Sequence, residues 1–193
     1  MKVVLSTGNS RKVEEIRAVF SGSHIEISSL NDVGIQGEAE EDGRTLNENA
    51  LKKALFAHEH APDSWTMADD TGIFIDELNG KPGVDTALWP VLRPTAEQVL
   101  YELKDLKSRL ATFITVVAIV SPTGESWFCE GSVRGKLLKA PRTQYHPRMP
   151  YGAIFVPDGS DKTLAEMTID EENAHSHRGK AFRQARTLLE KLS

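Results

Sequence analysis

Three observations predict an α/β fold with a mixed sheet and helices on its faces. Residues 3–5 form a short apolar run, and after a polar turn the apolar residues recur at helical spacing as far as Phe20, which is typical of a strand followed by a helix. Residues 111–120 (ATFITVVAIV) are almost all apolar and often β-branched, as in a central buried strand. Ser176 precedes a last segment whose apolar residues share one helical face. The 193 residues, 39% of them hydrophobic, suffice for one domain over 1–193.

Local signals predict the elements between these segments. Thr45 with Glu48 three residues later is a capping box, so we expect a helix from there to about residue 60. Residues 80–94 contain too many glycines and prolines for regular structure. The other expected elements are strands over 24–30, 65–68 and 154–156, a hairpin over 111–131, a helix from Thr95 to about 106, and polar loops over 31–43 and 141–150.

Composition and charge exclude several classes of protein. The sequence has 23 Lys and Arg and 28 Asp and Glu, so its net charge is -5. No general positive field is therefore available to hold a nucleic-acid polymer or an anionic membrane. No apolar run approaches the roughly 20 residues of a membrane span. The segment after Met1 turns polar too soon for a secretory signal, so we expect a cytoplasmic protein. Cys129 is the only cysteine, which excludes an internal disulfide and favours inert packing.

The polar turn over residues 6–12 (STGNSRK) is the first candidate site. Gly8 allows the backbone to approach a ligand, the amides at the helix start favour an anion, and Lys12 adds a full charge for a phosphate. The plainer interpretation is a capped turn without a ligand. The chain has no G-x-x-x-x-G-K-S/T pattern, so this turn is not a Walker A loop.

Two carboxylate pairs form the second candidate site. Glu40 and Glu41 lie in the acidic loop, and Asp69 and Asp70 follow a short apolar strand, where we expect them at the strand end. Adjacent carboxylates repel each other, and a divalent cation would relieve that repulsion. Magnesium prefers oxygen ligands of this kind, often one or two from the protein with phosphate and water as the others. For residues 38–42 alone, a solvated acidic loop remains the alternative.

The third candidate is the start of the last helix, Ser176-His177-Arg178. A helix N-terminus carries a partial positive charge, and here the sequence places cationic side chains beside it. We therefore expect an anionic ligand or a carboxylate to compensate.

Six sequence motifs occur in one order along nearly the whole chain. They are T-G-N-x-x-K near the N-terminus, E-E-x-G-x-T-x-x-E-N-A-x-x-K-A over 40–54, A-D-D-T-G-x-x-x-D-x-L-x-G-x-P-G-V over 68–84, E-G-x-x-x-G over 130–135, I-F-x-P-x-G with K-T-x-A-E-M over 154–167, and S-H-R-x-x-A over 176–181. In this combination the chain resembles the inosine triphosphate pyrophosphatase family, whose members act on noncanonical purine nucleoside triphosphates.

The resemblance implies a homodimer of single, elongated α/β domains, each with a central nucleotide-binding cleft. The implied reaction is Mg²⁺-dependent hydrolysis of a nucleoside triphosphate to the monophosphate and pyrophosphate. Asp70 matches the general base that activates water, with Lys12 and Lys53 as its catalytic partners. Magnesium would be held or oriented by Glu40 and Asp70, with Glu41 and Asp69 close by. The expected substrate-binding residues are Thr7, Gly8, Asn9, Ser10, Arg11, Lys12, Thr71, Tyr151, Gly152, Phe155, Glu172, His177 and Arg178.

The chain departs from the family pattern at four places. Gly152 stands where the family has an aspartate, and Glu172 stands where it has a lysine. Residues 85–90 replace the family's S-A-R-Y segment, which leaves Arg93 as only a distant candidate for its arginine. Residues 143–150 replace a glycine-rich approach to Tyr151. The phosphate and metal residues are all present, so the departures cluster around the base.

These departures predict retained chemistry with altered base specificity. A lysine is a donor suited to a 6-oxo group, whereas a carboxylate is an acceptor suited to an N–H or amino group. The sequence therefore predicts weaker discrimination in favour of inosine and xanthosine, unless a neighbour such as Arg148 or His175 replaces the lost lysine.

Two other functions remain open on the sequence alone. A nucleotide-binding protein of the same fold with little turnover would release no pyrophosphate, and an unrelated phosphohydrolase would release orthophosphate. The intact carboxylate set favours the pyrophosphatase.

Overall fold

Residues 1–192, described by a computed structural model, contain one seven-stranded mixed sheet. Its strand order is β2-β1-β3-β5-β6-β7, with the short β4 paired to β3. Strand β1 is parallel to β2 and β3, and the other pairs are antiparallel. The strands are β1 (Lys2–Leu5), β2 (Glu26–Ser29), β3 (Trp65–Ile75), β4 (Pro82–Gly83), β5 (Leu110–Val120), β6 (Ser126–Leu137) and β7 (Phe155–Pro157).

Five α-helices and five short 3-10 segments complete the fold within residues 1–192. The α-helices are α1 (Ser10–Phe20), α2 (Leu46–His60), α3 (Ala96–Glu102), α4 (Ile169–His175) and α5 (His177–Leu192). The 3-10 segments are η1 (Asn31–Val33), η2 (Asp76–Leu78), η3 (Val84–Leu88), η4 (Pro150–Ala153) and η5 (Leu164–Glu166). Within the same residues, no helix combines the length and the apolar character that a membrane crossing needs.

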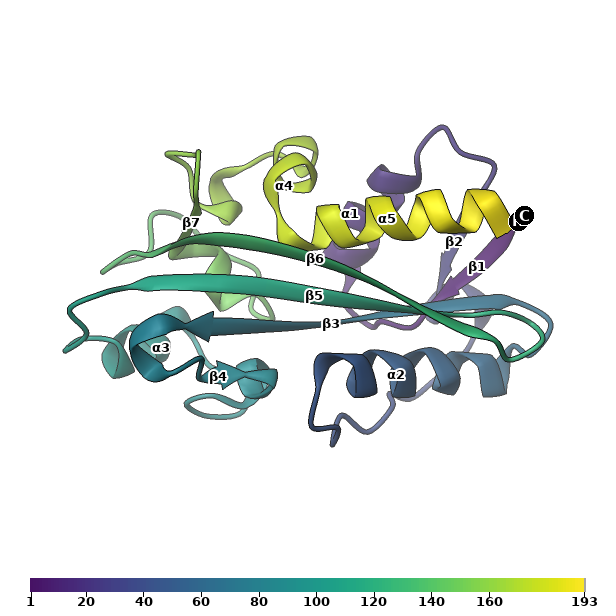
Figure 1. The fold of residues 1–193 in the computed structure, drawn as a ribbon, viewed down its shortest axis with the longest axis horizontal. Helices are drawn as coiled ribbons and strands as arrows, with labels where there is room; N and C mark the ends of the chain where they lie inside the picture. Colours follow the sequence, from purple (N-terminus) through teal and green to yellow (C-terminus); the bar gives the residue numbers. More distant parts are fainter. Residues whose placement is uncertain (193) are drawn as a thin grey trace.

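The sheet separates two layers of helices. Figure 1 shows α5 and α1 on one face of the long strands and α2 on the other. The side chains of β5 explain this arrangement, because successive side chains of a strand point to opposite faces of the sheet. Val117 and Ile119 pack with α1 and α5, whereas Val116 and Ala118 pack against α2. Strands β3, β5 and β6 run along the longest axis of the molecule (Figure 1).

A separate core fills the other end of the molecule. It joins α3 to the far ends of β3, β5 and β6 and to η4 and β7, through buried side chains such as Ile73, Leu103 and Phe113. The functional residues lie between this core and the core under α5. The hydrophobic effect holds each end together separately, which leaves room for a cleft between them.

The α/β class and the mixed sheet predicted from the sequence are confirmed, with changes in detail. Strand β3 is eleven residues long, so the expectation that Asp69 and Asp70 lie at a strand end is wrong. They lie in mid-strand because β5 pairs with β3 from Thr66 to Ile75. Helix α3 ends at Glu102 rather than near 106, and β6 continues to Leu137.

Two helix starts add further corrections. Thr45 caps α2 as expected, but the Glu48 carboxylate accepts a hydrogen bond from the backbone N–H of Arg44 rather than from that of Thr45. Helix α4 was not expected, although Thr168 and Glu171 form a capping box that marks its start. Cys129 is buried in the core under α5.

Candidate active site

A cleft of about 270 Å³ opens between the two ends of the molecule. Its walls come from the turn after β1, the middle of β3, α2, the segments around residues 86–94 and 147–152, and the starts of α1 and α5. The expected site residues that line it are Thr7, Gly8, Asn9, Lys12, Glu41, Lys53, Asp69, Asp70, Thr71, Tyr151, Gly152, Glu172, His177 and Arg178. The three candidate sites predicted from the sequence thus converge on one cavity.

The turn after β1 brings the start of α1 to the cleft. Asn9 caps the helix, since its side-chain oxygen accepts hydrogen bonds from the backbone N–H groups of Arg11 and Lys12. Thr7 in turn accepts a bond from the Asn9 N–H at 3.2 Å. A helix N-terminus and the Lys12 ammonium beside it form an arrangement suited to an anion.

Asp69 and Asp70 lie where β3 loses its neighbour. Strand β1 ends at Leu5, which pairs with Met67, and the chain then turns away. Their adjacency in sequence suggests that the two carboxylates touch. They do not, because adjacent residues of a strand point to opposite faces of the sheet. Asp69 points toward α1 and Asp70 toward α2, as their lysine partners show. The open edge of β3 lets one cleft reach both side chains.

Asp69 is neutralised by Lys12, whose Nζ lies 2.9 Å from Oδ2. Arg178 Nε lies 3.6 Å from the same oxygen, and the Thr71 hydroxyl donates to it at 3.3 Å. Burial would raise the pKa of Asp69, but the charges of Lys12 and Arg178 overcome this and hold the pKa well below its usual range. Asp69 is therefore a fixed anion.

Asp70 has a different environment on the other face of the sheet. Lys53 donates to its Oδ1 at 2.8 Å and also reaches Glu41 Oε2 at 3.0 Å, and Asn49 donates to Asp70 Oδ2 at 3.3 Å. Burial raises the pKa of Asp70, although Lys53 opposes that rise. A carboxylate with a raised pKa accepts a proton more readily than a normal aspartate.

The start of α5 supplies Arg178 and His177. Ser176 accepts a hydrogen bond from the Gly179 N–H and so caps the helix, as expected. Carboxylates compensate the cations there, because Arg178 donates to Glu15 at 2.8 Å and faces Asp69. Burial lowers the pKa of His177 well below its usual value, so its ring is neutral.

Glu15 connects Arg178 to a second guanidinium. It is 1% exposed, and it accepts bonds from Arg178 and from Arg11 at 3.0 Å. Arg11 also donates to Glu172 Oε2 at 3.1 Å. Burial, followed by the negative charge of Glu15, raises the pKa of Glu172 to about 7. This network links α1, α4 and α5 behind the cleft.

Aromatic and apolar groups form another part of the wall. The Phe113 ring meets His177 edge-on with centroids 4.5 Å apart, and Tyr151 meets Phe113 in the same manner at 6.1 Å. Pro150 and Leu164 also line the cleft here. A flat ring system can bury its faces against such groups.

Some expected residues lie outside the cleft wall. Glu40 is exposed, and Ser10 and Arg11 begin α1 without lining the cleft. Phe155 is fully buried in the core, packed on Phe113 with ring centroids 4.8 Å apart.

A known family model matches residues 3–188, a span that contains all six motifs. The chain belongs to the Ham1 family. The relationship expected from the motifs is confirmed.

Individual Ham1 relatives support the same assignment. A protein of Thermoanaerobacter pseudethanolicus named dITP/XTP pyrophosphatase is 38% identical over 195 residues, covering 98% of this chain and 96% of that protein. A Bacillus subtilis protein with the same name is 36% identical and covers 98% and 97%. The solved structure of a HAM1 protein from Coxiella burnetii is 30% identical, with a TM-score of 0.84 and 99% of each chain covered.

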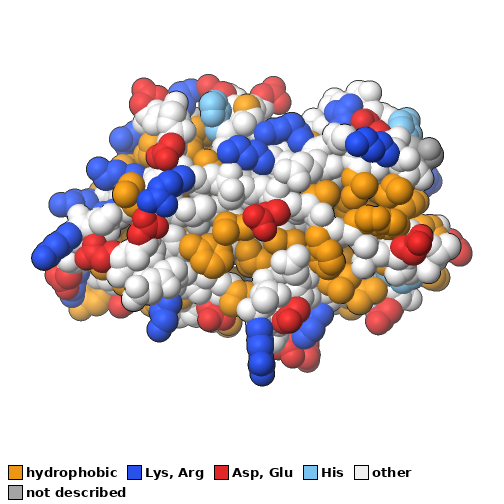
Figure 2. Space-filling model, viewed as in Figure 1, with side chains coloured by type: hydrophobic (Ala, Val, Ile, Leu, Met, Phe, Trp, Pro, Cys, Tyr) orange, Lys and Arg blue, Asp and Glu red, His pale blue; other side chains and the backbone are white. Residues whose placement is uncertain are grey.

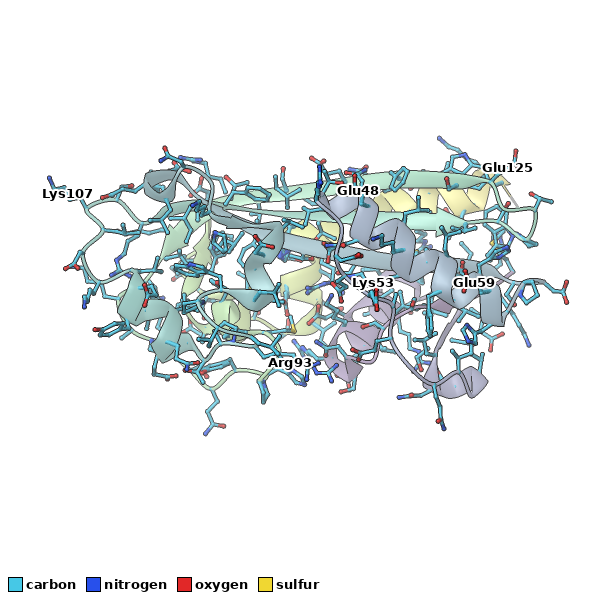
Figure 3. All side chains as sticks on the ribbon, turned by 90° about the horizontal axis from the view of Figure 1, so that it is seen from below. Glu48, Lys53, Glu59, Arg93, Lys107 and Glu125 are labelled. Atoms are coloured by element: carbon cyan, nitrogen blue, oxygen red, sulfur yellow. The ribbon has the colours of Figure 1, made fainter. Side chains whose placement is uncertain are left out.

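Three cleft residues of this Ham1 chain lie outside the expected set of site residues, although Arg93 and Arg148 were named as possible replacements for missing family residues. Arg93, only a distant candidate before, lines the cleft and has a φ of 53°. In Figure 3 it and Lys53 both lie near the middle of the long axis. Arg148 lies 3.7 Å from Glu38, and both line the cleft beside Gly8. Their positions depend on loops between remote elements, for which the sequence carries no local signal.

Three carboxylates of the Ham1 cleft, those of Glu41, Asp69 and Asp70, pair with lysines. Among residues 1–192, no group of three or more Asp, Glu, His or Cys side chains is placed to hold a metal ion. Glu41 and Asp70, however, converge on one cation, the Lys53 ammonium. Two oxygen donors fit magnesium when substrate phosphate and water supply the other ligands.

Proposed function

We propose that the chain hydrolyses noncanonical purine nucleoside triphosphates, such as deoxyinosine and xanthosine triphosphate, to the monophosphate and pyrophosphate. The observation that carries the proposal is the paired arrangement of Lys12 with Asp69 and Lys53 with Asp70 around one cleft. The lysines provide positive charge to bind a polyphosphate, and the carboxylates beside them can bind and activate a water molecule. The names of the Ham1 relatives, dITP/XTP pyrophosphatase, support the same reaction.

The cations would bind and orient the triphosphate. Lys12 lies in the first turn of α1, whose N-terminus favours an anion, and Lys53 approaches from the opposite face of the sheet. Both lysines now pair with carboxylates. Phosphate oxygens would compete for these ammonium groups, and that competition would free the carboxylates to face water. Charge on the pyrophosphate leaving group would then be neutralised where it develops.

Asp70 would act as the general base. Its raised pKa and its position at the open edge of β3 suit a group that takes a proton from water during attack on the α-phosphorus. Asn49 orients one oxygen, since its side-chain amide donates to Oδ2. Asp69 would serve differently, by holding Lys12 and Arg178 in place.

We also propose that the enzyme uses Mg²⁺, held by Asp70 and Glu41. Their convergence on Lys53 is the observation that supports this, and the ion would supply positive charge to the phosphates. Asp69 would stand close by, and a role for Glu40 stays a prediction.

A homodimer is the expected assembly, and an apolar surface supports it. Figure 2 shows apolar side chains gathered over the long strands and the edge of α2. Exposed or half-exposed apolar residues of these elements include Leu51, Leu55, Phe74, Ile114 and Phe128. We propose that a second copy covers this face. Light scattering should give twice the chain mass, and Phe128→Glu should give a monomer. A cytoplasmic location stays a prediction.

Product analysis tests the proposed reaction. Deoxyinosine triphosphate incubated with the protein and Mg²⁺ should yield equal amounts of deoxyinosine monophosphate and pyrophosphate. Tight nucleotide binding without turnover would instead indicate a nucleotide-binding protein of the same fold. Release of orthophosphate would indicate a different phosphohydrolase.

A further inference from the structure

The Glu172 carboxylate is a buried acceptor with one free oxygen. Glu172 is 4% exposed, yet it lines the cleft. Its Oε2 accepts the bond from Arg11, whereas Oε1 receives no hydrogen bond from any residue within 1–192. Oε1 is not one of the fully enclosed side-chain atoms that lack a partner within residues 1–192, so it is open to the cleft, where a donor group of a substrate can reach it.

Arg11 fixes which oxygen is free. Its guanidinium is itself held by Glu15, and Glu15 is held by Arg178, so the carboxylate is tied to α1 and α5. At pH values above about 7, where Glu172 is ionised, the two guanidiniums and the two carboxylates balance in charge. A ligand at Oε1 therefore meets an acceptor whose orientation is already set.

The base is the part of the substrate that suits this acceptor. A triphosphate would be repelled by a carboxylate and is drawn to Lys12 and Lys53 instead. A purine base carries N–H groups on its edge and has flat faces that fit beside Tyr151 and Leu164. Gly152 leaves space there, because a Cβ on it would meet only Ala165, at 3.7 Å or more.

We propose that Glu172 is a specificity-determining residue that accepts a hydrogen bond from the N–H at ring position 1 of a 6-oxopurine. The inference rests on the proposed function and names the atom by which the substrate is chosen. Hypoxanthine, xanthine and guanine carry this N–H, whereas adenine has an unprotonated nitrogen there, whose lone pair would face the carboxylate, so the contact separates 6-oxopurines from adenine. Glu172 can therefore favour inosine and xanthosine over adenosine.

A substitution that changes an acceptor to a donor tests the role of Glu172. In Glu172→Gln, the Arg11 guanidinium needs an acceptor, so the amide oxygen should turn toward Arg11 and the NH₂ group toward the cleft. That group would oppose the N–H of inosine and pair with the bare nitrogen of adenine. The ratio of kcat/KM for inosine triphosphate to that for adenosine triphosphate should fall by about 10- to 100-fold.

Two controls separate recognition from damage to the fold. Asp170→Asn removes an exposed carboxylate from the same helix and should leave the ratio unchanged. For the wild type, kcat/KM for 1-methylinosine triphosphate, which lacks the N–H, should be at least about 10-fold lower than for inosine triphosphate. Rates within threefold for these two substrates, or an unchanged ratio in Glu172→Gln, would overturn the inference.

Binding measurements keep this test independent of catalysis. Calorimetry with the non-hydrolysable α,β-methylene analogues of inosine and adenosine triphosphate should give the same change of preference in Glu172→Gln. If the wild type releases no pyrophosphate from any triphosphate, the proposed function fails, and the binding ratio still decides the role of Glu172.

Discussion

Lys53 on α2 lies 2.8 Å from Asp70 on β3 and closes the cleft from the side opposite Lys12. The same ammonium reaches Glu41, so one cation joins the acidic loop, the helix and the strand. Binding of a triphosphate would draw Lys53 toward phosphate and leave Asp70 with Asn49 as its remaining partner. In the proposed reaction, this exchange of partners would connect substrate binding to the activation of the carboxylate.

Asp70→Asn should abolish turnover and leave the fold intact. The amide has nearly the same volume but cannot accept the proton of water, and it is a weaker metal ligand. We expect kcat to fall by at least about 100-fold, with an unchanged circular dichroism spectrum. A loss of less than about tenfold, roughly 1.4 kcal/mol, would mean that Asp70 is not the base.

Lys12→Ala should weaken binding of the triphosphate far more than binding of the nucleoside. The reason is that the proposed site assigns its ammonium to phosphate and not to the base. Calorimetry with a non-hydrolysable triphosphate and with inosine gives the two affinities. Arg17→Ala, which removes a cation from the far end of the same helix, should change neither. Equal weakening of both ligands in Lys12→Ala would place this lysine away from the phosphates.

Glu15→Ala should destabilise the fold strongly. The substitution leaves the buried Arg178 guanidinium without its 2.8 Å partner, and removal of one member of a buried pair costs about 3 to 5 kcal/mol. Glu14 offers a matched control, because it is the adjacent glutamate and is exposed. Glu14→Ala should cost less than about 0.5 kcal/mol in urea unfolding. If Glu15→Ala and Glu14→Ala lowered the free energy of unfolding by similar amounts, Glu15 would not stabilise the fold through its pair with Arg178.

The pH dependence of stability should contain a contribution from Glu172. Burial raises its pKa from 4.5 in the unfolded chain to about 7 in the fold. Between these values the folded state keeps a proton that the unfolded chain has released, so this contribution to the free energy of unfolding falls as pH rises. Glu172→Gln lacks the proton equilibrium, and its stability relative to the wild type should improve from pH 4.5 toward 7. The free energy of unfolding in urea, measured against pH, gives this comparison. If it changed with pH in the same way for the wild type and Glu172→Gln, the pKa of Glu172 would not be raised in the fold.

Local patterns were enough to predict most of the elements. The capping residues Thr45, Thr95 and Ser176 each mark a helix start in the structure, because a cap is a local hydrogen bond between residues three apart. The length of β3 could not be predicted in this way. Its polar middle, from Asp69 to Thr71, stays in the sheet only because β5 pairs with it along that stretch.

The residues of the site could likewise be predicted from sequence motifs, whereas the ion pairs that connect them could not. Lys12, Asp70 and Arg178 belong to motifs that the chain shares with its family, and the structure brings all three to the cleft. The pairing of Glu15 with Arg178 spans 163 residues, and that of Arg11 with Glu172 spans 161. No local sequence pattern encodes contacts between residues so far apart in the chain. The sequence alone therefore showed Glu172 only as a glutamate in place of the family's lysine, without its arginine partner.

Hydrolysis in ¹⁸O-water tests the central claim most directly. If water attacks the α-phosphorus of deoxyinosine triphosphate, mass spectrometry will find one ¹⁸O atom in the deoxyinosine monophosphate and none in the pyrophosphate. Label in pyrophosphate or in released orthophosphate would show attack at another phosphorus, and the roles assigned to Lys12, Lys53 and Asp70 would be wrong.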